Sequence, residues 1–386
     1  MFYIAFKMLV GDRGKYLGII LGISFASLIM TQQPAIFSGL MTRTYSFITD
    51  LGLPDIWVMD PTVRYVDDGK TMPEKNLYRV ASIDGVAWAK PLYKGNIQAR
   101  LNTGTYQNCN LIGIDDTTLI GAPAQLIQGN IEGLWQADAV IVNEEGANDK
   151  LANPPVTSGG PKIPLRVGQE IELNDHRAVV VGIAKSTRTF QSLPVIFTTY
   201  SRAKQFVPPQ RNLLSYVLVK AKPGQDIDQL VHRIEKQSGL KALPREKFKD
   251  STIDYYFKYT GIPINFGVSV LLGFLVGAII AGQTFYSFTY ENLRYYGVLK
   301  AMGVADRTLL LMIVFQSLIV CFIGYGLGIA GTAIFAYFTK NSLLAFRFPW
   351  QLMVFSVFGV TVISALAALI SIRKVLKLEP AIVFKS

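Results

Sequence analysis

The sequence predicts an α-helical membrane protein with a large α+β domain, and the distribution of charge is the main observation behind this. Four long stretches lack Asp, Glu, Lys and Arg, and about 215 polar-rich residues separate the first from the second: Tyr16–Thr42, Tyr259–Tyr290, Thr308–Thr339 and Phe348–Ile372. A charged side chain at the bilayer centre costs about 2.5–3.5 kcal/mol, so each run marks a segment able to cross. Even 25 residues, the shortest run, reach about 37 Å as a helix, against a hydrocarbon core of about 30 Å.

The first run also has the features of a secretory signal peptide, because Lys7, Arg13 and Lys15 precede its apolar part. Residues 31–34 (Thr-Gln-Gln-Pro) lack the small-x-small pattern of a cleavage site, so we expect the run to be retained. The expected segments are a cytoplasmic amphipathic segment 1–15, a span 16–42, an extracytoplasmic domain 43–258, a span 259–290, a cytoplasmic helix 291–307, a span 308–339, an outer loop 340–347, a span 348–372 and a cytoplasmic tail 373–386.

The basic residues beside the spans predict the orientation. Only Lys340 and Arg347 occupy the loop between the third and fourth spans, whereas ten basic residues flank the other ends: Lys7, Arg13, Lys15, Arg294, Lys300, Arg307, Arg373, Lys374, Lys377 and Lys385. Positive charge accumulates on the cytoplasmic side. Both termini are therefore expected in the cytoplasm and the large domain outside, in a multi-pass protein of the inner (plasma) membrane.

The net charge of +11 lies mostly beside the membrane. Residues 44–260 hold 25 basic and 23 acidic residues, a balance of +2, so the remaining +9 flanks the spans, where anionic lipid headgroups attract basic side chains. Membrane lipid is thus the expected partner of this charge, and nucleic acid is not.

The sequence shows no catalytic or metal-binding pattern. Cys109 and Cys321 are assigned to different segments, so no disulfide is expected in the outer domain, and His176 and His232 have no companions at ligand spacing. Serine-hydrolase and zinc-protease motifs are absent. The paired acids at 67–68, 115–116 and 144–145 are expected in solvated loops. We expect no catalytic residue and no metal site, and the sequence assigns no substrate-binding residue.

The outer domain mixes helix and strand patterns without strict alternation, which favours an α+β fold. Strands are predicted at 55–59, 86–89, 96–101 and 216–220, helices at 75–83 and 226–237, and a hairpin at 169–181 around Asn174-Asp175. The segment 153–164, rich in Pro and Gly, is expected to be a loop. Two lobes are expected, one inserted near 120–208 and one closed by 55–115 and 213–245.

The most specific pattern, Glu291-Asn-Leu-Arg-Tyr-Tyr-Gly-Val-Leu-Lys-Ala-Met-Gly303, lies between the second and third spans. In a helix, Glu291 and Arg294 stack at i,i+3, and a set of apolar residues offers contact surface: Leu293, Tyr296, Val298, Leu299 and Met302. Such a helix, expected at the cytoplasmic ends of two spans, can be displaced by a soluble partner that binds to it. The alternative is a generic interfacial helix capped by Gly303.

At these residues the chain resembles the MacB/FtsX-type (type VII) permeases of ABC transporters. The family pattern E-x-x-R-x-x-G-x-L-[KR]-A-x-G matches at Glu291, Arg294, Gly297, Leu299, Lys300, Ala301 and Gly303, and a family tail of the form L-x-P-A matches at 378–381. The layout of one span, an outer domain and three spans also agrees. Tyr295-Tyr296 replaces the family's usual charged and β-branched pair.

The resemblance implies a partner that hydrolyses ATP. No Gly-x-x-x-x-Gly-Lys-[Ser/Thr] motif occurs in this chain, and only residues 1–15 precede the first span. The chain is therefore expected to be no enzyme and to hold no cofactor, with ATP and Mg bound by a separate ABC ATPase. The expected ATPase-coupling residues are Glu291, Arg294, Tyr296, Gly297, Leu299, Lys300, Ala301 and Gly303.

Small residues recur at four-residue intervals in the spans: Gly18, Gly22 and Ala26, then Gly273, Gly277 and Ala281, then Gly324 and Gly328. Such stripes let helix backbones approach closely in lipid. Packing within one subunit and dimerisation explain them equally well, and the resemblance favours a homodimer through the first two spans. Gln283, Thr284 and Gln316 are expected to form hydrogen bonds between helices.

The family mode implies mechanotransmission, in which ATP-driven motion at the inner face reaches the outer domain. Export of a lipid, glycolipid, peptide or drug through a periplasmic adaptor and outer-membrane duct is the first choice, and residues 76–80, 85–86, 91–93 and 113–116 resemble the glycolipid-exporting DevC branch. The alternatives are lipoprotein extraction by a Lol-type permease and an FtsX-like relay that activates a cell-wall hydrolase. A membrane enzyme ranks last.

Overall fold

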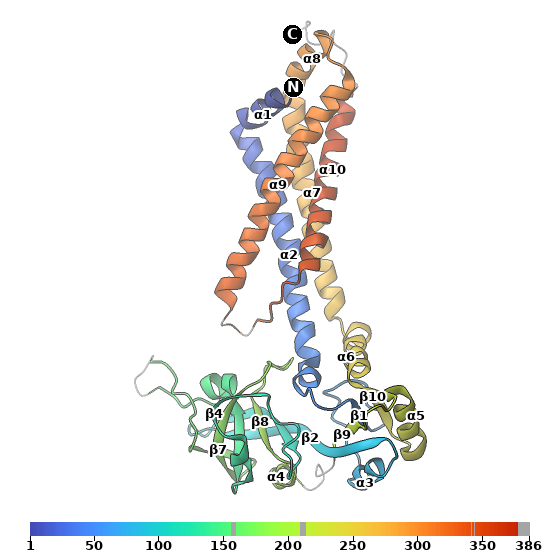
Figure 1. Ribbon diagram of the computed structural model, residues 1–386. Coiled ribbons are helices and arrows are strands. Elements are labelled where there is room, and N and C mark those ends of the chain that lie inside the picture. Colours follow the sequence, from blue (N-terminus) through green and yellow to red (C-terminus); the bar gives the residue numbers. More distant parts are fainter. Residues whose placement is uncertain (156–159, 209–213, 341, 343, 377–386) are drawn as a thin grey trace. The chain divides into compact units, whose positions relative to one another are not determined.

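The computed structural model describes residues 1–155, 160–208, 214–340, 342 and 344–376. The chain forms two compact units, one made of Met1–Leu40 and Gly261–Ser386 and the other of Met41–Thr260 (Figure 1). The tail pattern predicted at 378–381 lies outside the described residues.

The first unit is helical. Its helices are α1 (Phe2–Gly11), α2 (Arg13–Asp50), α7 (Ile262–Glu291), α8 (Leu293–Ala301), α9 (Asp306–Thr339) and α10 (Trp350–Leu376). Among the described residues four helices, α2, α7, α9 and α10, are long and apolar enough to cross a membrane. The predicted layout of one span, a large domain and three spans is therefore confirmed. In Figure 1, α1 and α8 lie at the same end of this bundle.

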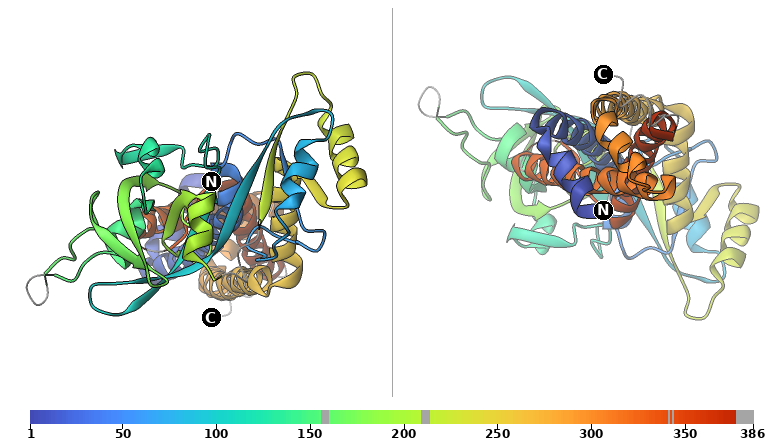
Figure 2. Two further views of the ribbon diagram at one scale, coloured as in Figure 1. Left: turned by 90° about the horizontal axis from the view of Figure 1, so that it is seen from below. Right: turned by 90° about the horizontal axis from the view of Figure 1, so that it is seen from above.

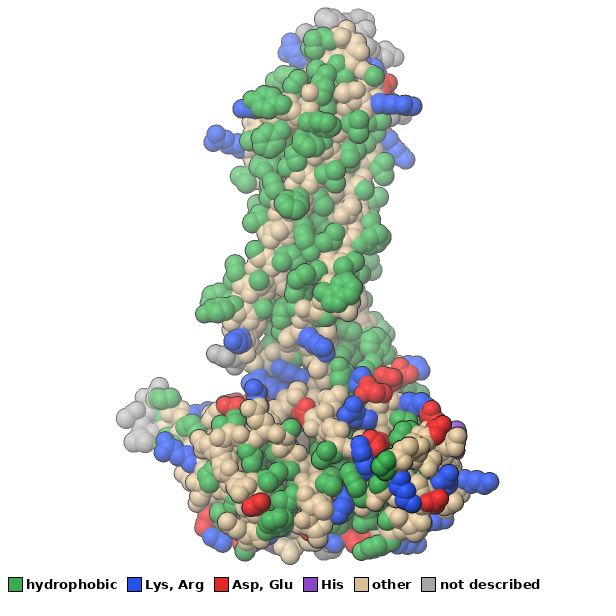
Figure 3. Space-filling view, viewed as in Figure 1, with side chains coloured by type: hydrophobic (Ala, Val, Ile, Leu, Met, Phe, Trp, Pro, Cys, Tyr) green, Lys and Arg blue, Asp and Glu red, His purple; other side chains and the backbone are tan. Residues whose placement is uncertain are grey.

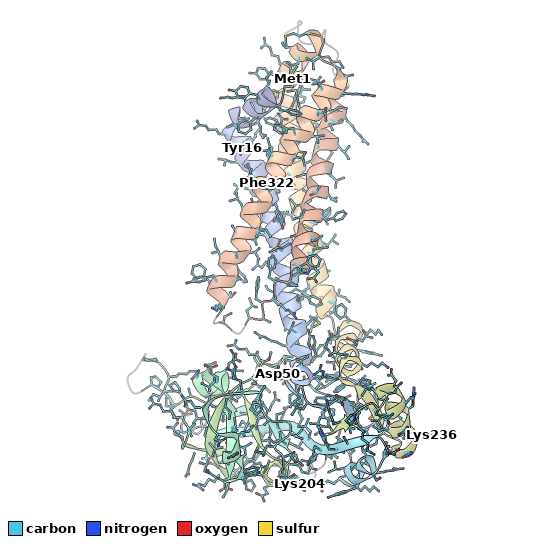
Figure 4. All side chains as sticks on the ribbon, viewed as in Figure 1. Met1, Tyr16, Asp50, Lys204, Lys236 and Phe322 are labelled. Atoms are coloured by element: carbon cyan, nitrogen blue, oxygen red, sulfur yellow. The ribbon has the colours of Figure 1, made fainter. Side chains whose placement is uncertain are left out.

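The flank of the bundle is apolar. Figure 3 shows hydrophobic side chains covering the helices on the face in view, with Lys and Arg gathered toward the ends. Phe322 on α9, which is labelled in Figure 4, is 81% exposed. Exposed apolar residues on this scale are favourable in a hydrocarbon environment and costly in water.

The second unit is built on a sheet of ten strands, counted over the described residues. Its path runs β10-β1-β9-β2-β3-β8-β5-β7-β4, with β6 off the path and paired with β2 and β7. The strands are β1 (Ile56–Met59), β2 (Val86–Arg100), β3 (Tyr106–Ile114), β4 (Gln125–Gly129), β5 (Ala139–Asn143), β6 (Glu170–Leu173), β7 (His176–Lys185), β8 (Val195–Thr199), β9 (Tyr216–Ala221) and β10 (Lys241–Pro244).

Alternation along the strands creates one hydrophobic core on each face of the sheet. In β1, Ile56 and Val58 join one core and Trp57 and Met59 join the other, because successive side chains of a strand point to opposite faces. The first core also holds residues of α3 (Lys75–Ala81), α4 (Tyr200–Phe206) and α5 (Ile227–Ser238), and the second holds Phe248 of α6 (Arg245–Tyr259). Strands with two covered faces explain why β1 and β5 are buried throughout.

The long strand β2 joins the two halves of this sheet. Its first part, Val86–Leu92, pairs with β9, and its second part, Tyr93–Arg100, pairs with β3. Strand β3 in turn pairs in parallel with β8. The left view of Figure 2 shows β2 in teal running between the two halves. Strand β2 therefore runs through one continuous sheet, and the division of this domain into two lobes, with one inserted near 120–208, stays a prediction.

The hairpin predicted at 169–181 is present as β6 and β7. Asn174 and Asp175 both have positive φ values, 46° and 65°, as a two-residue type I′ turn requires. The helix predicted at 226–237 is α5, and the side chain of Asp226 caps it by accepting from the amides of Asp228 and Gln229.

Candidate functional site

The predicted inner-face helix is α8, separated from α7 by one residue. Asn292 ends α7, and its side-chain amide donates to the carbonyl of Phe288 at 2.8 Å. This bond satisfies one of the carbonyls that a helix end leaves without a partner. The chain then continues directly into α8, so a displacement of α8 acts on the end of α7 without a flexible linker.

Gly303 stops α8 in a Schellman motif. Its φ is 88°, and its amide bonds to the carbonyl of Lys300 at 3.1 Å, while the amide of Val304 bonds to that of Leu299 at 3.1 Å. The ammonium of Lys300 lies 3.0 Å from the carboxylate of Asp306 at the start of α9. Gly303 thus has the capping role that was the alternative explanation of this residue.

The pattern residues divide between two faces of the helix. Tyr296, Gly297 and Leu299 are buried in the bundle. The exposed residues follow helical spacing and form one stripe: Glu291, Arg294, Tyr295, Val298, Ala301 and Met302. We call this stripe the outer face of α8. The apolar surface expected from Leu293, Tyr296, Val298, Leu299 and Met302 needs correction, because Tyr296 and Leu299 face inward and Tyr295 faces outward.

Three apolar side chains dominate the outer face. Tyr295, Val298 and Met302 are 61%, 41% and 67% exposed. Arg294 lies beside them, and within the described ranges it forms no ion pair. An exposed apolar stripe with one cation is a surface that a partner can bury, as in the groove binding of an amphipathic helix.

Glu291 makes its contact within the chain. Its carboxylate pairs with Lys15 near the start of α2, and Lys15 also contacts Asp12 at 2.9 Å. The hydrogen bond from Lys15 lowers the pKa of Asp12. The cluster therefore joins the start of α2 to the end of α7.

Tyr296 reaches a buried amide in α9. Its hydroxyl donates to Oε1 of Gln316 at 3.0 Å, and Nε2 of Gln316 donates to the carbonyl of Ala5 in α1 at 2.8 Å. Burial raises the pKa of Tyr296, which further favours the protonated hydroxyl that donates this bond. Gln316 thus forms the hydrogen bonds between helices that its position in an apolar run predicted. Its link to the pattern residues had no signal in the sequence.

The small-residue stripes meet each other inside one subunit. A Cβ on Gly22 would lie 2.6 Å from Ile280, and one on Gly277 would overlap the methyl of Ala26. Similarly, a Cβ on Gly324 would lie 2.6 Å from Ile23. The glycines of α7 and α9 therefore pack against α2, with Gly18 against Thr284, Gly273 against Ile29, Gly328 against Ser27 and Ala281 fully buried. Packing within the subunit accounts for these stripes.

No other constellation among the described residues suggests chemistry. They contain no group of His, Cys, Asp and Glu able to hold a metal ion. Cys109 and Cys321 are buried and unpaired, and burial raises the pKa of Cys109 to about 12.

Two family models match this sequence. The MacB-like periplasmic core domain matches residues 16–237, and the FtsX-like permease C-terminal domain matches residues 251–380. Uncharacterized ABC transporter permeases of Mycobacterium bovis and Mycobacterium tuberculosis are 26% identical over 226 residues, which span 56% of this chain and 58% of each relative.

Solved outer domains show lower similarity. The extracellular domain of the noncanonic ABC-type transporter YknZ from Gram-positive bacteria aligns with a TM-score of 0.35 and 14% identity, over 49% of this chain and 98% of that one. The periplasmic region of MacB from Actinobacillus actinomycetemcomitans aligns with a TM-score of 0.38 and 14% identity, over 53% and 94%. With its four membrane-spanning helices and both family domains, the chain belongs to the MacB/FtsX-type permeases of ABC transporters, which are multi-pass proteins of the inner membrane.

Proposed function

We propose that this chain conveys the ATP-driven motion of a separate ABC ATPase to its outer domain, without moving cargo through its own bundle. The observation that carries the proposal is the outer face of α8, a continuous stripe of exposed apolar residues on a helix that is anchored at both ends. In the proposed arrangement ATP and Mg are bound by the partner.

Docking of the ATPase is proposed to bury Tyr295, Val298 and Met302. Burying these side chains stabilises the complex by about 25 cal/mol for each Å² of apolar surface removed from water. Arg294 adds a charge that a carboxylate of the partner can pair, which favours one orientation. Tyr296, Gly297 and Leu299 are proposed to act from inside, by holding α8 against the bundle.

Transmission is proposed to run from α8 into α7 and α2. The Lys15–Glu291 pair and the glycine contacts support this route, because they join the two spans at the inner end and along the bundle. Closely packed helices have few empty volumes in which a displacement can be absorbed. Residues 41–260 are proposed to respond and to act on cargo.

The proposed orientation places both termini and α8 in the cytoplasm, supported by the ten basic residues near them. A homodimer is also proposed. Because the small-residue stripes are filled by helices of the same chain, its interface is proposed to use the exposed aliphatic faces of α2 and α7, such as Leu21 and Ile279, which are 65% and 64% exposed.

The proposed output is export of a lipid, glycolipid, peptide or drug, in concert with a periplasmic adaptor and an outer-membrane duct. The large outer domain, Met41–Thr260, and its match to the MacB-like core favour export over the FtsX-like relay, in which short outer domains are usual.

The test is binding of the purified ATPase to the chain in lipid nanodiscs. Val298→Asp places a charge in the apolar stripe and is expected to weaken binding about tenfold or more, the scale of a central interface residue. Phe322→Ala is the matched control, since it removes an exposed apolar side chain on α9 and should leave affinity unchanged. Equal affinity of Val298→Asp and the unmodified chain would refute docking at α8.

A further inference from the structure

Gln316 is a primary amide enclosed in the apolar interior of the bundle. It lies in α9 and is 0% exposed, as are both groups that it contacts, Tyr296 and Ala5. A buried amide without hydrogen bonds is costly, so such a group is retained where its bonds are satisfied. Both ends of the Gln316 amide are bonded.

The chemistry of the partners determines which way the amide points. The carbonyl of Ala5 can only accept, so the NH2 group of Gln316 must face α1. The amide oxygen of Gln316 then faces α8 and accepts a hydrogen bond from the Tyr296 hydroxyl. The two bonds run in one direction, Tyr296 to Gln316 to Ala5, and polarise each other.

This chain of bonds ties the consecutive helices α8 and α9 to α1, which is distant from them in sequence. Besides Ala5, α1 contacts α9 through the rings of Phe2 and Phe315, whose centroids are 4.8 Å apart. On the α8 side, Leu299 packs into the same core. An α8 displaced alone would leave either a phenol or an amide without a partner in an apolar core. Both bonds are kept if α1 and the part of α9 that carries Gln316 move together with α8.

Helix α1 is itself suited to the surface of a membrane. Phe2, Tyr3, Ile4 and Phe6 are between 41% and 71% exposed, and Lys7 lies next to them in the sequence. Apolar and aromatic side chains with an adjacent cation are typical of helices that lie in the interface between lipid and water.

We propose that Gln316 is a positioning residue that latches α1 to α8 through α9, so that α1, α8 and the part of α9 that carries Gln316 move as one body. This inference rests on the proposed coupling function. When the ATPase displaces α8, the latch makes α1 move with it, and the interfacial anchoring of α1 resists that motion. The membrane surface, through α1, thereby provides a fixed point against which the displacement of α8 acts.

The test measures the distance between spin labels placed at Tyr3 in α1 and Ala301 in α8, in the full chain in nanodiscs. The chain with Gln316 unmodified should give one narrow distribution of distances between the two labels. In Gln316→Leu a second, displaced population should rise about tenfold, the effect of losing a net hydrogen bond. Tyr296→Phe, which removes only the bond to α8, should give the same second population.

Thr332→Val is the control, because Thr332 is also buried in α9 but its hydroxyl bonds to Gly328 within the same helix. It should retain the narrow distribution. Identical distributions in Gln316→Leu, Tyr296→Phe and the control would overturn the latch. This comparison needs no ATPase, so it stands even if docking at α8 fails.

A second measurement adds the ATPase with and without trapped nucleotide. The distance from Tyr3 to Ala301 should be the same in both states of the unmodified chain and should differ between the states in Gln316→Leu. A distance that changes with nucleotide in the unmodified chain would show that the helices move separately and would overturn the proposal.

Discussion

Ala26 of α2 fills the space that a Cβ on Gly277 of α7 would need, with Ile363 of α10 closing the site 3.5 Å away. Gly277→Ala is therefore expected to destabilise the bundle by about 1–3 kcal/mol, the usual cost of overpacking. Thermal unfolding of the purified protein in detergent measures the effect.

Gly267→Ala provides the comparison on the same helix. A Cβ at Gly267 meets nothing within 4 Å, so the substitution should be neutral or stabilising by up to about 1 kcal/mol through its helix propensity. Equal losses of stability at Gly267 and Gly277 would mean that close packing against α2 is not what the glycine at 277 provides.

The pair between Lys15 and Glu291 makes a second prediction. Glu291→Gln removes the charge that joins α2 to α7, and we expect ATP hydrolysis by the reconstituted transporter to continue while transport per ATP falls severalfold. Membrane insertion should be unaffected. Asp254→Asn, which breaks the exposed pair with Lys258 in α6, is the control and should leave the ratio unchanged.

Gly297 is buried on the inner side of α8, and a larger residue there should push the helix outward. Gly297→Leu is expected to uncouple hydrolysis from transport more strongly than Glu291→Gln, because overpacking costs about 1–3 kcal/mol whereas an exposed ion pair contributes about 0–1 kcal/mol. Parallel assays of ATP hydrolysis and transport measure both variants. Normal coupling in Gly297→Leu would show that the position of α8 is not critical.

Asp115 makes stability of the outer domain depend on pH. Burial alone would raise its pKa, but hydrogen bonds from Thr118 and the ammonium of Lys90 outweigh burial and lower the pKa to about 2. Because the pKa of Asp115 is lower in the folded than in the unfolded protein, its ionised carboxylate stabilises the fold at pH values above the unfolded pKa of about 3.9. This stabilisation is lost as the pH falls toward 2. The contribution at pH 7 is about 2 kcal/mol.

Asp115→Asn should therefore lower unfolding stability at pH 7, and its difference from the unmodified protein should shrink between pH 4 and pH 2. Tryptophan fluorescence reports this unfolding, since three of the four tryptophans, Trp57, Trp88 and Trp135, lie in the outer domain. Asp250→Asn alters an exposed carboxylate and should show no such trend. A constant difference across that range would exclude ionisation of Asp115 as the cause.

Orientation is testable with single cysteines, because Cys109 and Cys321 are both buried. Tyr106→Cys, at an outer-domain position that is 58% exposed in the native protein, should react with an impermeant maleimide in intact spheroplasts. Met302→Cys on α8 should react only after permeabilisation. The reverse pattern would invert the proposed topology. Ser158, an alternative labelling position, lies outside the described residues.

The spans and the helix between the second and third spans could be predicted from sequence because their signals are local. Long charge-free runs reflect the cost of burying charge in lipid, and Asn174-Asp175 indicates its hairpin through turn chemistry alone. The parallel pairing of β3 with β8 had no such signal, because it joins Asn110 to Val195 across a long insertion.

The candidate site shows the same limit. The motif located α8, but helical spacing alone could not say whether Tyr295 or Tyr296 faces the bundle, because both are large and amphipathic. Tyr296 is the buried one of the two, and its hydroxyl bonds to Gln316 on another helix, α9. Asp115 likewise proved to be buried beside Lys90, although adjacent acids are usually solvated.

The glycine contacts of α2 also limit how it can slide. Gly18 and Gly22 are four residues apart, and each accommodates a side chain of α7. A shift of one residue along the axis would replace glycine by a bulkier side chain at these contacts, while a shift of four residues would bring one glycine to the place of the other. Axial displacement is therefore compatible with close packing only in discrete increments of about 6 Å, the rise of four residues in a helix.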